Sequence, residues 1–267
     1  MKWFEIFLVI STLGTGLCTL LDILFWSKQR KKQSELLDVE VPKVIEYARS
    51  FFPVLAIVLI LRSFIVEPYK IPSSSMMPNL LIGDFILVNK FAYGLRLPIS
   101  NYKFFPISEP KRGDVVVFNP PQAPDQNWIK RIVGLPGDHI GFHGDSLYIN
   151  GQKLRYLNEG PYIDHSSHPQ MPGANLLVEE LPGHPHTELE ILNQYMPAGQ
   201  GDWVVPKNHY FVMGDNRDNS EDSRFWTKTH FLPEENLRGK AFLIWLHCQG
   251  FLCKDGFDVS RIGLVIK

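Results

Sequence analysis

The sequence predicts a mostly β protein with an inserted subdomain, preceded by two transmembrane helices. Twenty glycines and twenty prolines among 267 residues favour many turns and short strands over a helical bundle. Two apolar runs near the N-terminus approach the length that crosses a bilayer. Between residues 155 and 201 the composition shifts to Pro, Gly, His, Asn and Glu, and the strand periodicity weakens. We therefore expect a β domain of residues 67–154 and 202–267, interrupted by a looser insertion or extended loop at 155–201.

Composition and cysteine spacing exclude several classes of function. The 27 Lys and Arg against 28 Asp and Glu leave a formal net charge of −1, so we expect no nucleic-acid partner. The three cysteines lack the spacing of a metal site, and we expect neither metal nor cofactor. Cys248 and Cys253 flank a short glycine-containing turn. They could form a disulfide in an oxidising compartment or remain two free thiols.

The first apolar run predicts a transmembrane helix within residues 1–26. No charge occurs from Ile6 to Leu21, and Trp3 and Trp26 frame the segment as interfacial aromatic residues do. A cleavable signal peptide is the alternative. The dense positive cluster Lys28–Lys32 follows the run instead of preceding it, which disfavours a signal peptide.

The second run, residues 51–66, predicts a second transmembrane helix. Arg62 interrupts it close to its far end, where a long side chain reaches the interface, and we expect Pro53 in the first turn. A buried core helix of similar length is the alternative. The positive-inside rule assigns the basic loop 27–50 to the cytoplasm. Two spans then leave the N-terminus and residues 67–267 on the exterior or periplasmic side.

Three serines, Ser73 to Ser75, stand between Pro72 and Pro78 directly after the second run. Each proline fixes its own φ and restricts the residue before it, so we expect the serines on a short extended segment. A rigid segment of this kind suits a nucleophile or a backbone N–H donor. A serine-rich turn after a membrane helix is the alternative. The residue types alone do not distinguish the three serines.

A serine nucleophile needs a base and an oxyanion site. No histidine stands inside the motif-like stretches, and Asp114 and Asp138 lie in turns where Asp is common for structural reasons. Lys130 lies in the strand candidate 128–134. An exposed Lys130 would be charged and idle, whereas burial would lower its pKa and supply a neutral amine. The sequence pattern leaves both possibilities open.

Two further stretches admit more than one interpretation. The polar run 214–224 follows a strand that ends in glycine, and it is either a solvated loop or a hydrogen-bonding platform. The insertion holds four histidines without a matched ligand set, and we interpret them as solvated loop residues instead of a metal site. These are His165, His168, His184 and His186.

With these stretches in order, the chain resembles the bacterial type I signal peptidases, also called leader peptidases, of the Gram-negative kind with two membrane spans. The resemblance rests on both apolar runs with their basic loop, Pro72–Pro78, Arg112–Asp114 with the valines that follow, Lys130–Arg131 with Gly134–Asp138, and Gly214–Arg224. It implies an antiparallel-sheet catalytic domain of the signal-peptidase type. Two departures are Ser74, where glycine is common, and Asn79, where threonine is usual.

The resemblance also assigns roles to individual residues. It implies that Ser75 is the nucleophile and Lys130 the general base. The Ser75 backbone N–H and the Ser73 hydroxyl would form the oxyanion hole, and Ser220 would orient the lysine amine. Asp222 with Arg224 would form a supporting ion pair beneath the site, for which a weak surface pair is the alternative.

The implied activity is that of a serine endopeptidase of the inner membrane that removes N-terminal signal peptides from exported preproteins. It would cut an extended substrate after small residues of an A-x-A-like site. Membrane lipid is the expected environment and a monomer the expected state. The residues expected to line the substrate pockets, each of which could instead be core, are Tyr69, Ile71, Met76, Leu80, Ile86, Val117, Trp128 and Ile129.

Three other functions are compatible with parts of this pattern. One is a related Ser–Lys processing protease of the pilin type, and another is a self-cleaving repressor, which two membrane spans disfavour. The third is a membrane-anchored binding protein that has lost catalysis. That protein would be expected to lack Ser75 or Lys130, and both are present.

Overall fold

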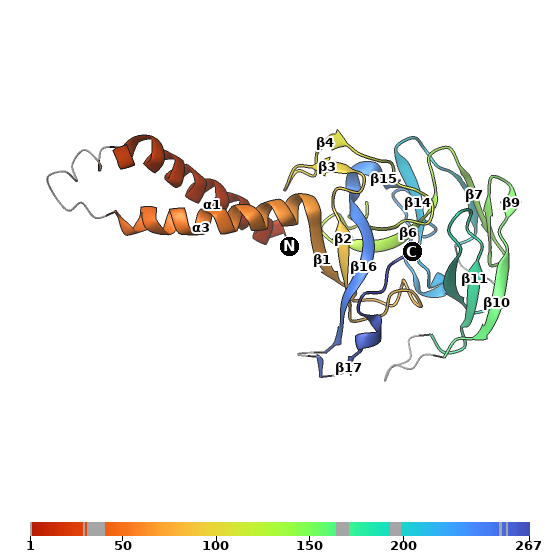
Figure 1. Cartoon of the computed structure of the whole chain (residues 1–267). Helices are drawn as coiled ribbons and strands as arrows, with labels where there is room; N and C mark the ends of the chain where they lie inside the picture. The colour runs from red at the N-terminus through yellow and green to blue at the C-terminus, as the bar shows by residue number, and fades with distance from the viewer. Residues whose placement is uncertain are drawn as a thin grey trace. The chain divides into compact units, whose positions relative to one another are not determined.

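The computed structural model describes residues 2–28, 30, 41–163, 171–192, 199–250, 253–254 and 256–267. Within these ranges the chain forms two compact units (Figure 1). One unit comprises Met1–Val66 with Arg96–Phe104, and the other comprises Glu67–Leu95 with Phe105–Lys267. The helices expected to cross the membrane belong to the first unit, and nearly all strands belong to the second.

The first unit contains two long helices, each of which ends in a π-helical turn. They are α1 (Lys2–Leu21) with η1 (Asp22–Trp26), and α3 (Lys43–Ile60) with η2 (Leu61–Ile65). The helix α3 begins at Lys43, inside the segment expected as a loop, because residues 43–52 contain neither proline nor glycine. Pro53 therefore lies in the helix interior, and its expected place in the first turn is wrong.

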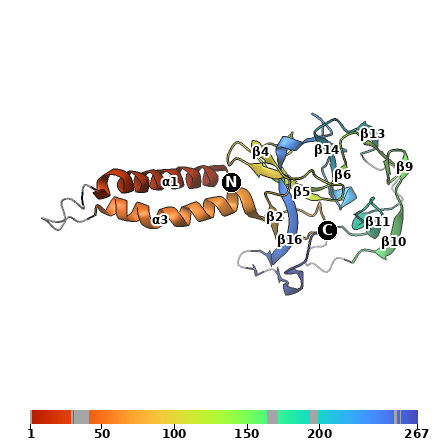
Figure 2. The ribbon, with the colours of Figure 1, turned by 45° about the horizontal axis from the view of Figure 1, so that its top comes forward.

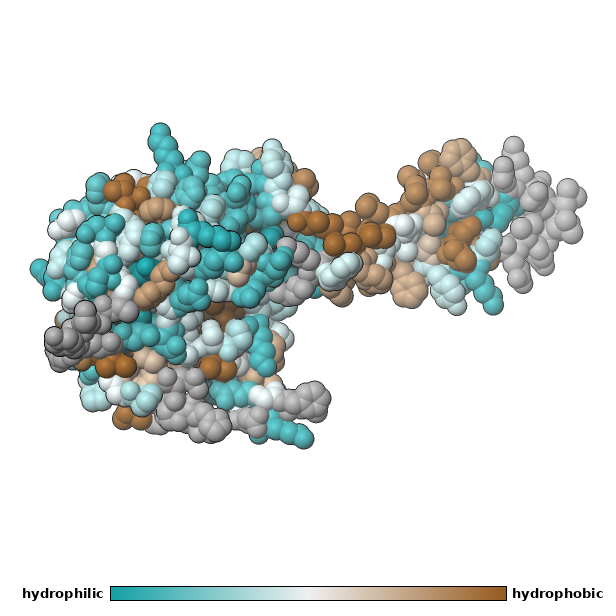
Figure 3. Space-filling view, turned by 180° about the vertical axis from the view of Figure 1, so that it is seen from behind, coloured by the Kyte–Doolittle hydropathy of each residue, from teal (hydrophilic) through white to brown (hydrophobic). Residues whose placement is uncertain are grey.

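Both helices are long and apolar enough to cross a membrane, over Trp3–Trp26 and Lys43–Ile65. Figure 3 shows hydrophobic side chains along them. Buried Asp22 forms ion pairs with Arg30 and with Arg49 of α3. The pair with Arg49 connects η1 to the first half of α3. The exposed apolar residues include Phe7, Ile10, Leu13, Leu17, Leu20, Val54, Ile57 and Leu61.

The second unit is built on a large sheet with strand order β1-β2-β16-β5-β6-β14-β15, and β17 pairs with β16. The central strands pair antiparallel, which confirms the predicted mostly β fold class. Figure 1 shows β16 running along β2. The strands are β1 (Val66–Lys70), β2 (Asp84–Asn89), β5 (Val115–Phe118), β6 (Trp128–Gly134), β14 (His209–Met213), β15 (Leu232–Pro233), β16 (Leu237–Gln249) and β17 (Gly256–Phe257).

Side chains of β5 show how both faces of this sheet are covered. Val115 and Val117 pack into a cluster with Ile71, whereas Val116 and Phe118 pack into a second cluster. Successive side chains of a strand point to opposite faces, so β5 is buried on both. The neighbouring strand β6 therefore lies in the middle of a covered sheet.

Smaller elements complete the fold. A four-stranded sheet has the order β13-β7-β8-β9, and β3 pairs with β4. Cys248 and Cys253 form a disulfide, which settles the alternative left open by the sequence. The remaining bounds are β3 (Gly94–Arg96), β4 (Lys103–Pro106), β7 (His139–His143), β8 (Ser146–Ile149), β9 (Gln152–Lys153), β13 (Gly201–Val204), η3 (Arg217–Asn219), η4 (Glu234–Asn236) and η6 (Val259–Arg261).

The insertion forms a three-stranded sheet of its own, β10 (Tyr156–Pro161), β11 (Asn175–Glu179) and β12 (His186–Glu190). Figures 1 and 2 both show β10 and β11 side by side. His186 is only 7% exposed, so its interpretation as a solvated loop residue is wrong. Burial lowers its pKa to about 4, which leaves the ring neutral. His184 is partly buried, and His165 and His168 lie outside the described residues.

A buried ionic contact anchors this inserted sheet. Arg217 Nη2 lies 2.7 Å from Glu179 Oε2 and 2.7 Å from Glu188 Oε2, and all three residues are buried. Burial alone would raise the pKa of Glu179, but the charge and hydrogen bond of Arg217 bring it below its ordinary value. Burial raises the pKa of Glu188 well above its ordinary range, which favours the neutral form of this carboxyl. Arg217 and Glu179 therefore form the charged pair.

We expect Arg217→Met to lower the free energy of unfolding by about 3–5 kcal/mol, because Glu179 would be left buried without its cation. The matched control is Lys153→Met, which removes a cation from an exposed strand residue and should change stability little. Thermal unfolding of the detergent-solubilised protein measures both. Equal effects of the two substitutions would contradict the buried pairing.

Candidate active site

The serine segment lies in the connection between β1 and β2. Met77 N donates to Ser74 O at 3.0 Å and Leu80 N donates to Met76 O at 2.9 Å, so the segment is a turn. The extended conformation expected from the two prolines is therefore wrong. Ser74 and Ser75 are buried in this turn, and Ser73 is exposed.

The turn brings Ser75 against Lys130. Lys130 Nζ lies 2.6 Å from Ser75 Oγ, and the two residues are only 4% and 8% exposed. Burial lowers the pKa of Lys130 from 10.5 to about 8, and the negative charges of Asp222 and Asp215 limit the shift. The alternative of an exposed, idle lysine is therefore wrong.

Strand register explains why Lys130 meets the polar run. Lys130 pairs with Val116 of β5, and the next residue, Arg131, pairs with Met213 at the end of β14. Gly214, which follows Met213, therefore leaves the sheet beside Lys130. The pairing of β6 with β14 therefore places the start of the 214–224 segment next to Lys130.

Arg131, the residue after Lys130 on β6, also binds the polar segment. Its guanidinium makes two hydrogen bonds of 2.8 Å to Asp215, and it also donates to Gly113 O at 2.8 Å and Lys267 O at 2.7 Å. Arg131 and Asp215 are each 1% exposed. A buried bidentate pair thus ties β6 to the polar segment immediately after Gly214.

The polar segment is a hydrogen-bonding platform, as one of the two interpretations predicted. Asn216 N donates to Ser75 O at 3.1 Å, and Asn216 Nδ2 donates to Ser74 O at 3.1 Å. Asn219 Nδ2 donates to Ser74 Oγ at 2.7 Å. Gly214 passes close to the turn, because an added Cβ would lie 2.2 Å from Ser220 Oγ and 2.5 Å from Ser75 O.

Asp222 and Arg224 form a buried pair. Arg224 Nε lies 2.9 Å from Asp222 Oδ1, and Asp222 also accepts from Gly214 N at 3.0 Å and from Ser220 Oγ at 2.8 Å. Burial alone would raise the pKa of Asp222, but Arg224 and these donors bring it below its ordinary value. Asp222 is 0% exposed, so the alternative of a weak surface pair is wrong.

Ser220 and Ser73 occupy different positions relative to the pair. Ser220 directs its hydroxyl to Asp222, and the described residues show no hydrogen bond between Ser220 and Lys130. The expected direct contact of Ser220 with the amine is therefore replaced by a contact through the carboxylate beneath it. Ser73 Oγ lies 3.4 Å from Ser75 Oγ, which places a second hydroxyl beside the first.

Most residues expected to line substrate pockets belong to one apolar cluster that includes Met76, the neighbour of Ser75. Tyr69 packs against this cluster, whereas Trp128 belongs to the opposite face of the sheet. The Trp128 ring lies 6.0 Å from Lys130 Nζ. The buried cluster members among the expected residues are Ile71, Met76, Leu80, Ile86, Val117 and Ile129.

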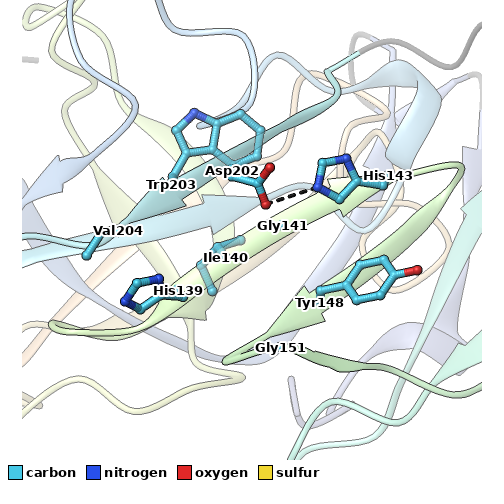
Figure 4. Close-up of a pocket in the computed structure, with 9 residues that line it drawn as sticks. All are labelled: His139, Ile140, Gly141, His143, Tyr148, Gly151, Asp202, Trp203 and Val204. Atoms are coloured by element: carbon cyan, nitrogen blue, oxygen red, sulfur yellow. Dashed lines mark hydrogen bonds and ion pairs between the residues drawn. The ribbon is translucent and has the colours of Figure 1, made fainter.

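A separate hollow of about 340 Å³ lies over β7, β8 and β13 (Figure 4). Gly141 forms part of it, and its rim carries His143, whose Nε2 lies 3.0 Å from Asp202 Oδ1. Its lining includes neither Ser75 nor Lys130. Among the described residues no group of three or more His, Cys, Asp or Glu could hold a metal ion.

Sequence reasoning missed several groups that hold the serine turn. Asn216 and Asn219 contact Ser74 and Ser75, and Asn79 contacts Asp215 at 2.7 Å. The signal for the first two was the density of polar residues after a strand. Asn79 was visible only as a departure from the family pattern.

We expect Gly214→Ala to lower the free energy of unfolding by about 1–3 kcal/mol, because the added methyl group overlaps Ser220 and the Ser75 carbonyl. Each kcal/mol should lower the melting temperature by about 2–4 °C for a domain of this size. Thermal unfolding measures the change. Gly14→Ala is the control, since no atom lies within 4 Å of its added Cβ. An unchanged melting temperature for Gly214→Ala would contradict the close approach.

Comparison with known proteins confirms the family resemblance. A family model described as signal peptidase, peptidase S26, matches residues 44–246. The signal peptidase I of Pseudomonas fluorescens is 41% identical over 98% of this chain and 98% of its own length. That of Pseudomonas aeruginosa is 38% identical at 98% coverage of both, and that of Haemophilus influenzae is 34% identical over 85% of this chain and 77% of its own. This chain therefore belongs to the signal peptidase family, peptidase S26, and is a signal peptidase.

Proposed function

We propose that this protein is a membrane-bound serine endopeptidase that removes N-terminal signal peptides from exported preproteins with a Ser75–Lys130 dyad. The observation that carries the proposal is the 2.6 Å contact between Ser75 Oγ and the buried Lys130 Nζ. A pKa of about 8 lets a usable fraction of the amine be neutral near physiological pH. A serine with a neutral lysine is an attested variant of the catalytic triad.

In the acylation step, Ser75 Oγ attacks the carbonyl carbon of the scissile peptide bond while Lys130 Nζ accepts the hydroxyl proton. The carbonyl oxygen becomes an oxyanion. The backbone N–H of Ser75 and the hydroxyl of Ser73, which lies beside Ser75 Oγ, would donate to it. The C–N bond then breaks as the lysine ammonium returns its proton to the leaving amine, which leaves an ester on Ser75.

In the deacylation step, Lys130 takes a proton from a water molecule that attacks the ester carbonyl. The second tetrahedral species collapses with loss of Ser75 Oγ, which regains the proton from Lys130. The products are the signal peptide with a free carboxyl group and the mature protein with a free amino group. Ser220 and Arg224 act on this cycle through Asp222, which sets the charge near the amine.

The substrate would bind as an extended strand. Among the described residues, only the part of β6 from Arg131 to Gly134 pairs with β14. The part of β6 from Trp128 to Lys130 therefore presents a free strand edge on the side of β14. The strand β1 is the edge strand at one end of the large sheet. A peptide could pair with these edges near Ile71 and Trp128 by β-addition. The small side chains of an A-x-A-like cleavage site would lie next to Met76, which follows Ser75 and belongs to the apolar cluster.

The two apolar helices support attachment to the bacterial inner membrane. The basic loop 27–50 would be cytoplasmic, and the N-terminus and the catalytic unit would be periplasmic. The exposed apolar residues of the helices would contact lipid. A monomer suffices for this function because Ser75 and Lys130 belong to one chain.

We expect wild type to cleave a purified secretory preprotein after its A-x-A-like site, and Ser75→Ala and Lys130→Ala to lower kcat by about a thousandfold or more. Cleavage by the detergent-solubilised chain is followed by gel and by mass spectrometry of the new N-terminus. Melting temperatures of both variants control for folding.

The exposed neighbour Ser73 offers a matched control. Ser73→Ala should lower kcat without abolishing it, since one of two oxyanion donors remains. Near-normal activity of Ser75→Ala would transfer the nucleophile to Ser73 or Ser74. Absence of cleavage by wild type would favour a binding protein.

We expect kcat/KM to fall about tenfold for each pH unit below about 8, because protonation removes the neutral form of Lys130. Burial, then Asp222, Asp215, Arg224 and Glu221, set this pKa. Glu221→Gln removes an exposed charge that raises it, so the acid limb should shift slightly to lower pH. Initial rates from pH 5 to 9 measure both profiles. A rate independent of pH over this range would exclude a lysine base.

A further inference from the structure

We infer that the inserted sheet β10-β11-β12 positions the nucleophile, and that it does so through a contact between Thr187 of β12 and Asn79 of the serine turn. This inference rests on the proposed function, in which Ser75 attacks and Lys130 is the base. It gives the insertion a role in the chemical step instead of in substrate selection. Thr187 and Asn79 are positioning residues and touch no substrate in this account.

Both the nitrogen and the oxygen of the Asn79 side-chain amide take part in the contact. Asn79 Nδ2 donates to Thr187 O at 2.7 Å, and Thr187 Oγ1 donates to Asn79 Oδ1 at 2.8 Å. The same Nδ2 donates to Asp215 Oδ2 at 2.7 Å. Three hydrogen bonds fix the amide orientation. Asn79 follows Pro78 in the turn that carries Ser75, so its orientation bears on the position of that turn.

Asp215 links this contact to the base. It accepts one bond from Asn79 and two from Arg131, the residue next to Lys130 on β6. Backbone contacts place β12 beside the same segment, since Leu189 N donates to Asp215 O at 2.9 Å. The nucleophile turn and the base strand therefore meet at the buried carboxylate of Asp215, and the inserted sheet contacts the backbone of the same residue.

The inserted sheet is itself held in place on the polar segment. Glu188, next to Thr187, contacts Arg217, and Leu189 forms a bridge with Asn216. Asn216 in turn donates to Ser75 O at 3.1 Å. Thr187 thus precedes two anchored residues of the same strand, which makes it a fixed point for Asn79.

A second contact holds the other side of the nucleophile. Ser74 Oγ accepts from Asn219 Nδ2 at 2.7 Å. Ser74 and Asn79 are the two positions where this chain departs from the family pattern, and both use their side chains in these ties. Glycine has no side chain, and a threonine hydroxyl cannot supply the three bonds of the Asn79 amide. Both ties on the Ser75 turn therefore depend on the side chains that this chain carries at these two positions.

The test compares Thr187→Val, which keeps the shape and removes the hydroxyl, with Thr187→Ser, which keeps the hydroxyl. The full-length chain in detergent is assayed on the same preprotein, with Thr227→Val as the exposed matched control. We expect Thr187→Val to lower kcat about 10- to 100-fold with KM changed less than about twofold, since small displacements of reacting groups cost rate. Thr187→Ser and Thr227→Val should stay within about threefold of wild type.

The pH profile provides a second readout. If the turn loosens, water reaches Lys130, and the midpoint of the acid limb should move above 8 toward the ordinary lysine value in Thr187→Val. A lower melting temperature with unchanged kcat and midpoint would mean a packing role only and would overturn the inference. A raised KM with unchanged kcat would also overturn it, because the insertion would then contact substrate.

Failure of the inference differs from failure of the proposed function. If wild type cleaves and neither Ser75→Ala nor Lys130→Ala does, the dyad stands whatever Thr187→Val does. Asn79→Asp keeps the shape of the side chain and places a carboxylate against Asp215. It should lower kcat more than Thr187→Val does, and equal kcat in Asn79→Asp and wild type would also overturn the inference.

Discussion

Burial of the Lys130 amine is the constraint on which the proposed site depends. Lowering the pKa from 10.5 to about 8 means that burial favours the neutral amine over the ammonium ion by about 3 kcal/mol more than water does. Asp222 opposes this shift and Arg224 favours it. Because Arg224 neutralises Asp222 directly, the pair keeps a buried carboxylate near Lys130 without holding the lysine as an ammonium ion. The Asp222–Arg224 ion pair therefore affects the pKa of Lys130 as well as the fold.

The geometry of the site is assembled from segments that are far apart in the chain. The pairing of β6 with β14 places Gly214 beside Lys130. Because Gly214 has no side chain, the polar segment can approach the Ser75 carbonyl. Backbone and amide donors of that segment then hold the turn from one side. Preorganisation of this kind places the cost of ordering the reacting groups in the folded state instead of in the chemical step.

The sequence sufficed for the fold class and the apolar helices, because composition and hydrophobic runs are local signals. It did not reveal whether Lys130 is buried, since alternation assigns a face of β6 but not what covers that face. The start of α3 at Lys43 was missed because the hydrophobic run is shorter than the helix. The hydrogen bond from Ser220 to Asp222, two residues along the chain, was also missed, because the sequence pattern does not show in which direction the hydroxyl points.

The insertion was the least predictable part, and its register explains how a polar sequence becomes ordered there. In β12, Glu188 reaches Arg217 and Thr187 reaches Asn79. A slip of one residue would turn every side chain of the strand to the opposite face, so both contacts would be lost together. The polar contacts of Glu188 and Thr187 thus favour the one register of β12 that places Thr187 against the serine turn.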